Sequence, residues 1–162
     1  MSGCRRQCNW DENDVCKSCG IDYSPPKKLR PFHLAFPVID MASTIKFYTE
    51  SLGFSTGRIS DHSTVFNFHG HQVIAQLVEK MPEAATEPPK GKLIPDLHFG
   101  LVLEWNDWHM LKAKFAADEI VIGPYARYEG LAREQMTFFV KDPNGNHLEF
   151  KTFKDDSAIF DF

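Results

Sequence analysis

Apolar and polar residues alternate in several short stretches of this chain, a pattern typical of strands that bury one face. Residues 32–38 form the first of these stretches. Leu34, Phe36 and Val38 share one face of the predicted strand, and His33 lies on the other. The sequence therefore predicts a strand whose apolar side packs into a core and whose histidine faces away from that core.

A helix is predicted directly after this strand. Asp40 is a suitable N-cap, and Gly53 provides a C-terminal stop. Between them, apolar residues recur with helical spacing at Ile45, Tyr48 and Leu52. Three short strands are then predicted at residues 57–60, 64–68 and 72–78, with His69-Gly70 as the turn between the last two. The element order up to residue 78 is therefore βαβββ.

The same order repeats in the second half of the chain. A strand is predicted at residues 97–103, and the helix after it carries Trp108, Leu111 and Phe115 on one face. Asn106 or Asp107 is expected to cap this helix. Strands are then predicted at residues 120–122, 133–140 and 147–153. We therefore expect an α+β fold of two βαβββ units, residues 31–78 and 97–154, that form a cupped, partly closed mixed sheet around a cavity. The proline-rich residues 79–96 are expected to cross the surface as a loop.

The last two predicted strands form a hairpin around the turn Asp142-Pro-Asn-Gly145. In its second strand Leu148 and Phe150 point to one face and Glu149 points to the other. A carboxylate between two large apolar neighbours needs a partner, because an unpaired charge is costly to bury. The partners that we expect are His33 and His98, with one metal ion held between the three side chains.

The two histidines occupy matching places in the repeat. Each stands near the start of the first strand of its unit, and the small residue two places on, Ala35 or Gly100, leaves space on the same face. Two imidazoles and one carboxylate can occupy one face of an octahedral metal and leave three positions open. The alternative is structural, with each histidine hydrogen-bonded in the core and Glu149 paired with a cation such as Lys151.

The cysteines point to a second metal site. All four lie in the first segment, residues 1–30, which ends in the linker Ser24-Pro-Pro-Lys-Lys28. Four thiolates in a short loop can close a tetrahedral structural site that holds zinc or an iron–sulfur centre. The alternative, a disordered and reduced tail with idle thiols, stays open. The segment resembles a small bacterial Cys-rich family of unassigned function, and its candidate ligands are Cys4, Cys8, Cys16 and Cys19.

Composition narrows the classes of partner. With 162 residues, 43% apolar and 25% charged, the chain can bury a core without disulfides. Its net charge is −4 and the basic residues are scattered, which argues against a nucleic-acid partner. No apolar run reaches membrane-spanning length and the N-terminus lacks the apolar region of a signal peptide, so we expect no membrane partner and a cytoplasmic protein. Residues 155–162 form a C-terminal tail without a predicted role.

Several motifs resemble a known family over residues 31–154. Three segments carry the resemblance, namely His33-Leu-Ala-Phe-Pro-Val-Ile-Asp40, Phe47-Tyr-x-x-x-Leu-Gly-Phe54 and Val140-Lys-Asp-Pro-Asn-Gly-Asn-His-Leu-Glu-Phe150. They resemble the vicinal oxygen chelate superfamily, which includes glyoxalases, extradiol dioxygenases and antibiotic-resistance proteins. Within it, the chain most resembles small proteins described as predicted extradiol-type dioxygenases. The resemblance implies metal ligands at His33, His98 and Glu149. The fourth family position falls on Gln76, where close relatives often have His, and His71 ranks below it.

A predicted loop at residues 123–130 is expected to close over the mouth of the cavity. It carries Tyr125 and Arg127 as candidate substrate-binding residues and Tyr128 as a candidate catalytic residue. His109 is a second candidate for acid–base catalysis, and His69 has less support. Extradiol enzymes generally use a histidine and a tyrosine near the metal, and the sequence assigns neither role firmly.

Three hypotheses of function follow. The first is a dioxygenase of the extradiol type that uses Fe(II) (or Mn) to cleave a small catechol-like substrate with O₂. The second is a glyoxalase-like isomerase that uses Ni or Zn, although Gln76 cannot accept a proton where that family has a glutamate. The third is a metal-free binding protein of the bleomycin-resistance kind. Family members often pair their units in dimers, so a homodimer is a candidate assembly.

Overall fold

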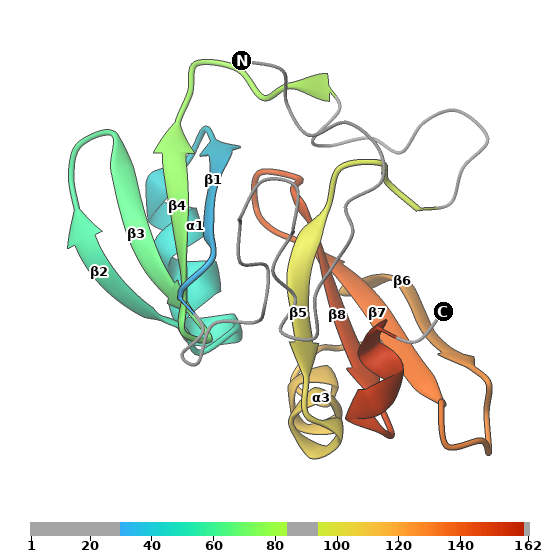
Figure 1. The fold of residues 1–162 in the computed structure, drawn as a ribbon. Helices are drawn as coiled ribbons and strands as arrows, with labels where there is room; N and C mark the ends of the chain where they lie inside the picture. Colours follow the sequence, from blue (N-terminus) through green and yellow to red (C-terminus); the bar gives the residue numbers. More distant parts are fainter. Residues whose placement is uncertain (1–29, 84–93, 161–162) are drawn as a thin grey trace, which may run out of the picture. The chain divides into compact units, whose positions relative to one another are not determined.

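The computed structural model describes residues 30–83 and 94–160 of the 162-residue chain. The chain divides into two units between Pro31 and Phe32, and both predicted repeats lie in the second unit (Figure 1). In the described part of the chain, no helix is long and apolar enough to cross a membrane. The four cysteines of the predicted N-terminal metal site lie outside the described residues.

The first repeat begins with strand β1, His33–Val38. Helix α1, Met41–Lys46, follows and continues in a π-helical turn, Phe47–Ser51. Asp40 caps this helix as predicted, because its carboxylate accepts a hydrogen bond from the Ser43 backbone N–H at 3.1 Å. Three strands complete the repeat, namely β2 (Ser55–Ile59), β3 (Ser63–Phe68) and β4 (His71–Leu77).

The second repeat has the same order of elements. Strand β5, Phe99–Leu103, leads into helix α3, Trp105–Lys112. Strands β6 (Ile120–Arg127), β7 (Gln135–Lys141) and β8 (His147–Phe153) follow. The predicted tail contains a short 3-10 helix, Asp156–Phe160. The βαβββ repeat predicted from the sequence is therefore confirmed.

Each repeat builds its own four-stranded mixed sheet. The strand order is β1-β4-β3-β2 in the first sheet and β5-β8-β7-β6 in the second. In each sheet the first strand of the repeat pairs in parallel with the last, and the other neighbours are antiparallel. The α+β class is confirmed. The sequence predicted one cupped, partly closed sheet, and the structure has two four-stranded sheets that are not closed into one.

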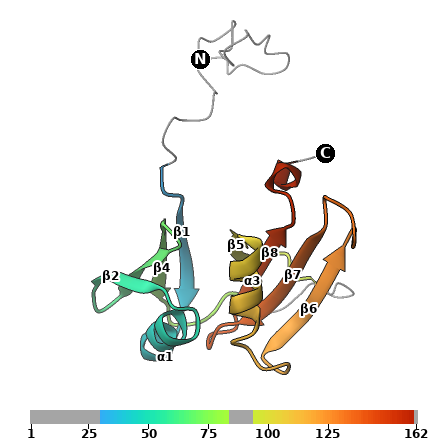
Figure 2. The same ribbon diagram turned by 90° about the horizontal axis from the view of Figure 1, so that it is seen from below.

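Helices α1 and α3 each lie against one face of the sheet of their own repeat (Figure 2). The buried apolar residues of both repeats form one continuous cluster. Phe36 of β1 and Phe99 of β5 are in ring contact within it, with 5.0 Å between the ring centroids. Trp108 of α3 is fully buried and donates its indole N–H to the Phe150 carbonyl at 2.8 Å. The helices therefore cover the apolar side of each sheet and leave the other side open for chemistry.

The turn between β7 and β8 ties the two repeats together by hydrogen bonds. Asn144 is buried, and its side-chain oxygen accepts the backbone N–H groups of Ile39 at 2.9 Å and Asp40 at 3.0 Å. Its amide nitrogen donates to the Thr44 hydroxyl at 2.7 Å. Asn146 donates to the Pro37 carbonyl at 3.0 Å. The predicted hairpin turn is therefore confirmed, but it is a buried connection between the repeats rather than an exposed loop.

The Asp142 carboxylate accepts several hydrogen bonds inside this turn. It accepts the backbone N–H groups of Asn144 at 2.8 Å and Asn146 at 2.9 Å, and the Asn146 side chain at 2.9 Å. Tyr48 of the first repeat donates its hydroxyl to the same carboxylate at 3.4 Å. Burial raises the pKa of Asp142, whereas the hydrogen bonds from Asn146 and Asn144 act in the opposite direction. Burial likewise raises the pKa of Tyr48.

Two local predictions in the second repeat are wrong. Helix α3 begins at Trp105 with Glu104 as its N-cap residue, and Glu104 makes no side-chain capping bond. The predicted loop at residues 123–130 is mostly strand, because β6 continues through Gly123 and Pro124 to Arg127. Irregular register between β6 and β7 accommodates the positive φ of Gly123. The Gly123-Pro124 pair favoured a loop in the sequence, but it lies within a strand.

Replacing Asn144 with Ala should lower the free energy of unfolding by about 2–4 kcal/mol, because it leaves the N–H groups of Ile39 and Asp40 without their acceptor. Urea denaturation measures this loss. Asn67 provides a matched control, since its side chain accepts one N–H, that of Gly70, in an exposed hairpin turn. Asn67→Ala should cost less than about 1 kcal/mol. Equal losses in the two variants would contradict a special role for the β7–β8 turn.

Candidate functional site

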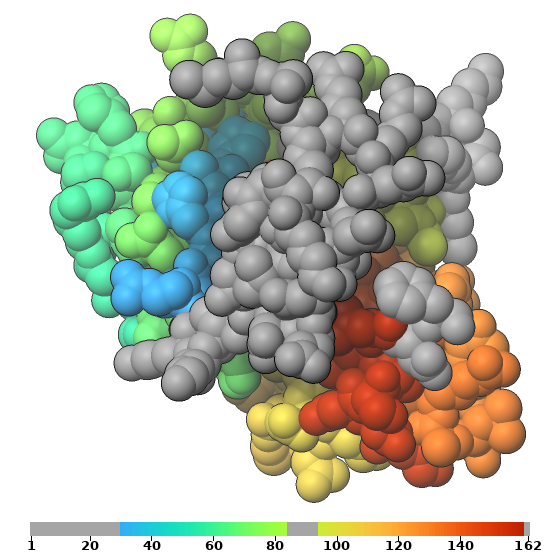
Figure 3. Space-filling model, in the orientation of Figure 1, coloured from blue at the N-terminus to red at the C-terminus, as the bar shows by residue number. Residues whose placement is uncertain are grey.

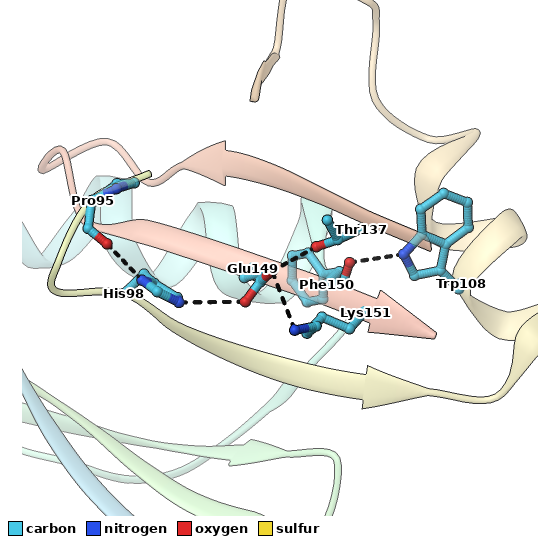
Figure 4. Close-up of polar contacts among 7 residues, drawn as sticks. All are labelled: Pro95, His98, Trp108, Thr137, Glu149, Phe150 and Lys151. Atoms are coloured by element: carbon cyan, nitrogen blue, oxygen red, sulfur yellow. Dashed lines mark hydrogen bonds and ion pairs between the residues drawn. The ribbon is translucent and has the colours of Figure 1, made fainter. Parts of the chain in front are cut away.

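Glu149 stands on the open face of the second sheet, in the centre of β8. Its neighbours Leu148 and Phe150 are fully buried on the helix side, as the alternation predicted. One oxygen of Glu149 accepts the Thr137 hydroxyl of β7 at 2.7 Å. Lys151, two residues along the same face, places its ammonium 3.8 Å from that oxygen. The Glu149 carboxylate is therefore held in place through one oxygen, and its second oxygen faces His98 (Figure 4).

His98 lies directly before β5 and turns toward that second oxygen. Its Nδ1 atom lies 2.8 Å from the Pro95 carbonyl, which can only accept, so Nδ1 carries a proton, and in the neutral ring Nε2 then has a lone pair. Nε2 lies 3.3 Å from Oε2 of Glu149 (Figure 4). Two lone-pair atoms at this distance repel each other unless a proton or a metal cation lies between them.

A divalent cation fits this arrangement. Metal–nitrogen and metal–oxygen bonds to these side chains are about 2.1 Å long, so two such bonds at an angle of about 100° give the observed separation of the donor atoms. Nδ1 of His98 donates to a backbone carbonyl, and metal-bound histidines usually make such a hydrogen bond through the ring nitrogen that does not bind the metal. The structure therefore brings two of the three predicted ligands, His98 and Glu149, to a separation that a divalent cation could bridge.

The third predicted ligand, His33, lies elsewhere. It is exposed at the start of β1, and its Nδ1 donates to the Gln72 side-chain oxygen at 2.8 Å, which leaves Nε2 with a lone pair. Among residues 30–83 and 94–160, no three His, Cys, Asp or Glu side chains lie close enough to share an ion. A single copy of the chain therefore brings His98 and Glu149 together but does not bring His33 to them.

Gln76, the predicted fourth ligand, lies opposite Pro37 in the register of β1 and β4, four residues along from the partner of His33. This offset corresponds to about 13 Å along the strand. The position that matches Glu149 in the first repeat holds Ile74, because Ile74 pairs with Ala35 as Glu149 pairs with Gly100. This face of β4 therefore presents no carboxylate.

Gly100 allows β5 and β8 to approach closely beside the site. A Cβ atom at this position would overlap the backbone carbonyl of Glu149. The sequence predicted that Gly100 leaves space in the cavity, and that interpretation is wrong, because the space is filled by the neighbouring backbone. Glycine is required here so that the strand carrying Glu149 can pair with the strand that follows His98.

Replacing Gly100 with Ala should lower the free energy of unfolding by about 3 kcal/mol, because the added methyl group forces β5 and β8 apart. Gly57 in β2 serves as the control, since a Cβ there meets only ordinary contacts at 3.5 Å or more. Gly57→Ala should change stability by less than about 0.5 kcal/mol. Chemical denaturation of both variants, with near-ultraviolet circular dichroism or fluorescence detection, measures the difference. A stable Gly100→Ala protein would contradict the close approach.

A cavity of about 690 Å³ opens beside the His98–Glu149 pair, a size usual for small-molecule sites. Apolar and polar side chains share its walls. Tyr125 and Arg127 of β6 line it, so both predicted substrate-binding residues face the candidate site. The β6–β7 part of the chain, orange in Figure 3, lies at the surface. The other lining residues are Ile94, Ala126, Gln135, Met136, Thr137, Phe139 and Lys151.

The two predicted catalytic residues do not line this cavity. Tyr128 follows β6 with a positive φ of 55°, and the Arg133 guanidinium stacks over its ring at 4.2 Å. His109 lies on α3 between Trp105 and Trp108, with ring centroids 5.1 and 5.0 Å away. Because α3 packs on the helix side of β8, His109 lies across the sheet from Glu149. Sequence reasoning missed Thr137, which the alternation of β7 places on the same face as Glu149, whereas it named Lys151 as the cation that could pair with this carboxylate.

Comparison with known proteins defines the class of this fold. Residues 30–150 match the model of the Glyoxalase/Bleomycin resistance protein/Dioxygenase superfamily, and the chain belongs to that superfamily. A curated relative is the virulence protein STM3117 of Salmonella typhimurium. It is 32% identical over 123 residues, which cover 75% of this chain and 82% of that protein.

Solved structures agree with this assignment. A glyoxalase/bleomycin resistance protein/dioxygenase from Alicyclobacillus acidocaldarius superimposes with a TM-score of 0.64 at 27% identity, covering 85% of this chain and 99% of that one. The crystal structure of STM3117 gives a TM-score of 0.52 at 26% identity, covering 78% and 98%. A lactoylglutathione lyase from Agrobacterium tumefaciens, at 14% identity and a TM-score of 0.53, shares the fold.

Proposed function

We propose that this protein is a metal-dependent enzyme whose metal centre is completed by two copies of the chain. His98 and Glu149 of one copy supply two ligands, and His33 of a second copy supplies the third. The observation that carries the proposal is the pair of facing lone-pair atoms, Nε2 of His98 and Oε2 of Glu149, 3.3 Å apart. A proton or a shared metal cation stabilises such a pair, and the separation of the two donor atoms suits a divalent cation bound to both.

The state of His33 supports its role as the third ligand. Its Nδ1 contacts the Gln72 side-chain oxygen as Nδ1 of His98 contacts the Pro95 carbonyl, so the same ring nitrogen, Nε2, is the one that could bind a metal in both residues. His33 is also exposed at the start of its strand and accessible to another molecule. Two imidazoles and one carboxylate from two copies give the facial set of ligands found in non-haem iron enzymes.

The chemistry that this set supports best is oxidative cleavage of a catechol-like substrate. A bound Fe(II) would supply the electron transfer that allows O₂ to react with the ring, and both oxygen atoms enter the ring-opened product. The protein holds Glu149 through Thr137 and His98 through Pro95, so neither ligand has to reorganise. The Lys151 ammonium favours an ionised substrate oxygen at this end of the cavity.

The isomerase alternative needs a proton acceptor from the first repeat. Gln72, Ile74 and Gln76 occupy the open face of β4, and none of them has a carboxylate. Glu149 is then the one acidic ligand, and it is the residue required to hold the metal. This favours the oxygenase over proton transfer between two carbon atoms.

Mixed dimers test the shared site directly. His33→Ala and His98→Ala copies should each bind no iron at this site, whereas a dimer of one copy of each contains one intact site and should retain about half of the wild-type iron. Differently tagged copies allow tandem purification, and metal analysis gives the iron content. The Cys16→Ser and Cys19→Ser changes in every copy remove a contribution from the N-terminal cysteines. His109→Ala should keep the full content, and an empty mixed dimer would contradict the shared site.

Activity assays separate the reaction classes. Protein purified without oxygen and loaded with Fe(II) should consume O₂ and form a ring-opened product with at least one member of a catechol panel. Glu149→Gln should lower the rate by more than about a hundredfold, because it removes the anionic metal ligand. Conversion of the methylglyoxal–glutathione adduct without O₂ would support the isomerase. Tight binding of small molecules by metal-free protein would support a binding role and contradict both enzymes.

A further inference from the structure

The cavity beside His98 and Glu149 is also lined by a basic residue that lies far from them along the sheet. Arg127 is the last residue of β6 and lines the cavity. In the sheet register Arg127 pairs with Gln135, and Gln135 pairs with Phe153, four residues beyond Glu149 on β8. Two strand spacings and four residues correspond to about 16 Å between the backbone positions of Arg127 and Glu149. The cavity is therefore elongated between the proposed metal end and Arg127.

Arg127 has no carboxylate partner among the residues that the structure describes, 30–83 and 94–160. Nearby Arg133 differs, since its guanidinium stacks over the Tyr128 ring outside the cavity. An arginine that lines a cavity without a carboxylate partner is well suited to bind an oxyanion through two parallel hydrogen bonds.

Apolar side chains contribute to the lining between the charged groups. Tyr125 and Phe139 are among them, with Phe139 directly opposite Glu149 in the β7–β8 register and Tyr125 two residues before Arg127 on β6, and Ile94 and Met136 also line the cavity. Lys151 adds a second cation beside the His98–Glu149 pair, so the described residues of the lining include Arg127 and Lys151 as cations and Glu149 as the carboxylate. A divalent metal would make this surface more positive still. A ligand with one charged group would leave one end of the cavity unmatched.

We propose that the substrate of this cavity is an elongated anion with a chelating group at one end and a carboxylate or similar oxyanion at the other. The chelating oxygens bind at the His98–Glu149 end, an apolar middle section lies against Tyr125 and Phe139, and the terminal oxyanion binds Arg127. This inference rests on the proposed function for its metal end. It adds the recognition of a distant acidic group, which selects acids over neutral compounds of the same shape.

A pair of hydroxamates tests this selection, because a hydroxamate chelates a divalent metal whatever reaction the enzyme catalyses. Adipic acid monohydroxamate carries a terminal carboxylate, and hexanohydroxamate has the same chain without it. Zinc-loaded protein should bind the acid about tenfold more tightly in calorimetric titrations, because a charged hydrogen bond to Arg127 is added. Arg127→Gln should reduce the two affinities to nearly the same value.

Arg58→Gln is the matched control, since Arg58 is an exposed arginine of β2 that does not line the cavity. This variant should keep the tenfold preference. His98→Ala protein should bind neither hydroxamate, which separates this site from zinc held at the N-terminal cysteines.

The outcomes separate this inference from the proposed function. Three outcomes would overturn the proposal of an acidic substrate and leave the metal centre in place. They are equal affinities of the wild-type protein for the two probes, a preference that survives Arg127→Gln, and no binding of either probe to zinc-loaded protein. If wild-type and His98→Ala proteins bind the same amount of zinc, the metal centre itself fails and the inference fails with it.

Discussion

The buried hydrogen bonds of the β7–β8 turn are the interaction on which the rest of the second unit depends. Asn144 and Asn146 reach the backbone of the first repeat, where β1 ends and α1 begins. Asp142 in turn holds both asparagines. Buried polar groups of this kind stabilise one arrangement, because any other arrangement leaves them without partners. The same turn fixes the start of β8, two residues before Glu149.

Strand β8 connects this turn to the site and fixes the position of Glu149. It lies between β5 and β7 in the sheet, so its two faces are set by pairing on both sides. The Trp108 indole binds the Phe150 carbonyl on the helix side, and Thr137 binds Glu149 on the open side. The lack of a side chain at Gly100 lets β5 pair with β8 at Glu149. A rigid strand with a polar group on one face is a precise support for a metal ligand.

The proposed division of the metal centre between two copies links catalysis to assembly. A ligand set that is complete only in the dimer makes metal binding stabilise the dimer, and dimer formation strengthens metal binding by the same free energy. The cavity extends from that centre along β7 and β6 to Arg127. One end of the cavity would then determine the reaction and the other the selection of substrate.

The sequence by itself determined the repeat and the buried faces, and it named the candidate ligands. Alternation in residues 147–153 placed Leu148 and Phe150 in the core and Glu149 on the open face, because the side-chain period of a strand is fixed by its geometry. Only the tertiary structure decided the rest. It showed that the Asp142 turn is buried against α1, that residues 123–127 are strand, and that His33 lies apart from His98. Local pattern does not encode these features, because they depend on how distant segments pack and on which copy of the chain supplies a neighbour.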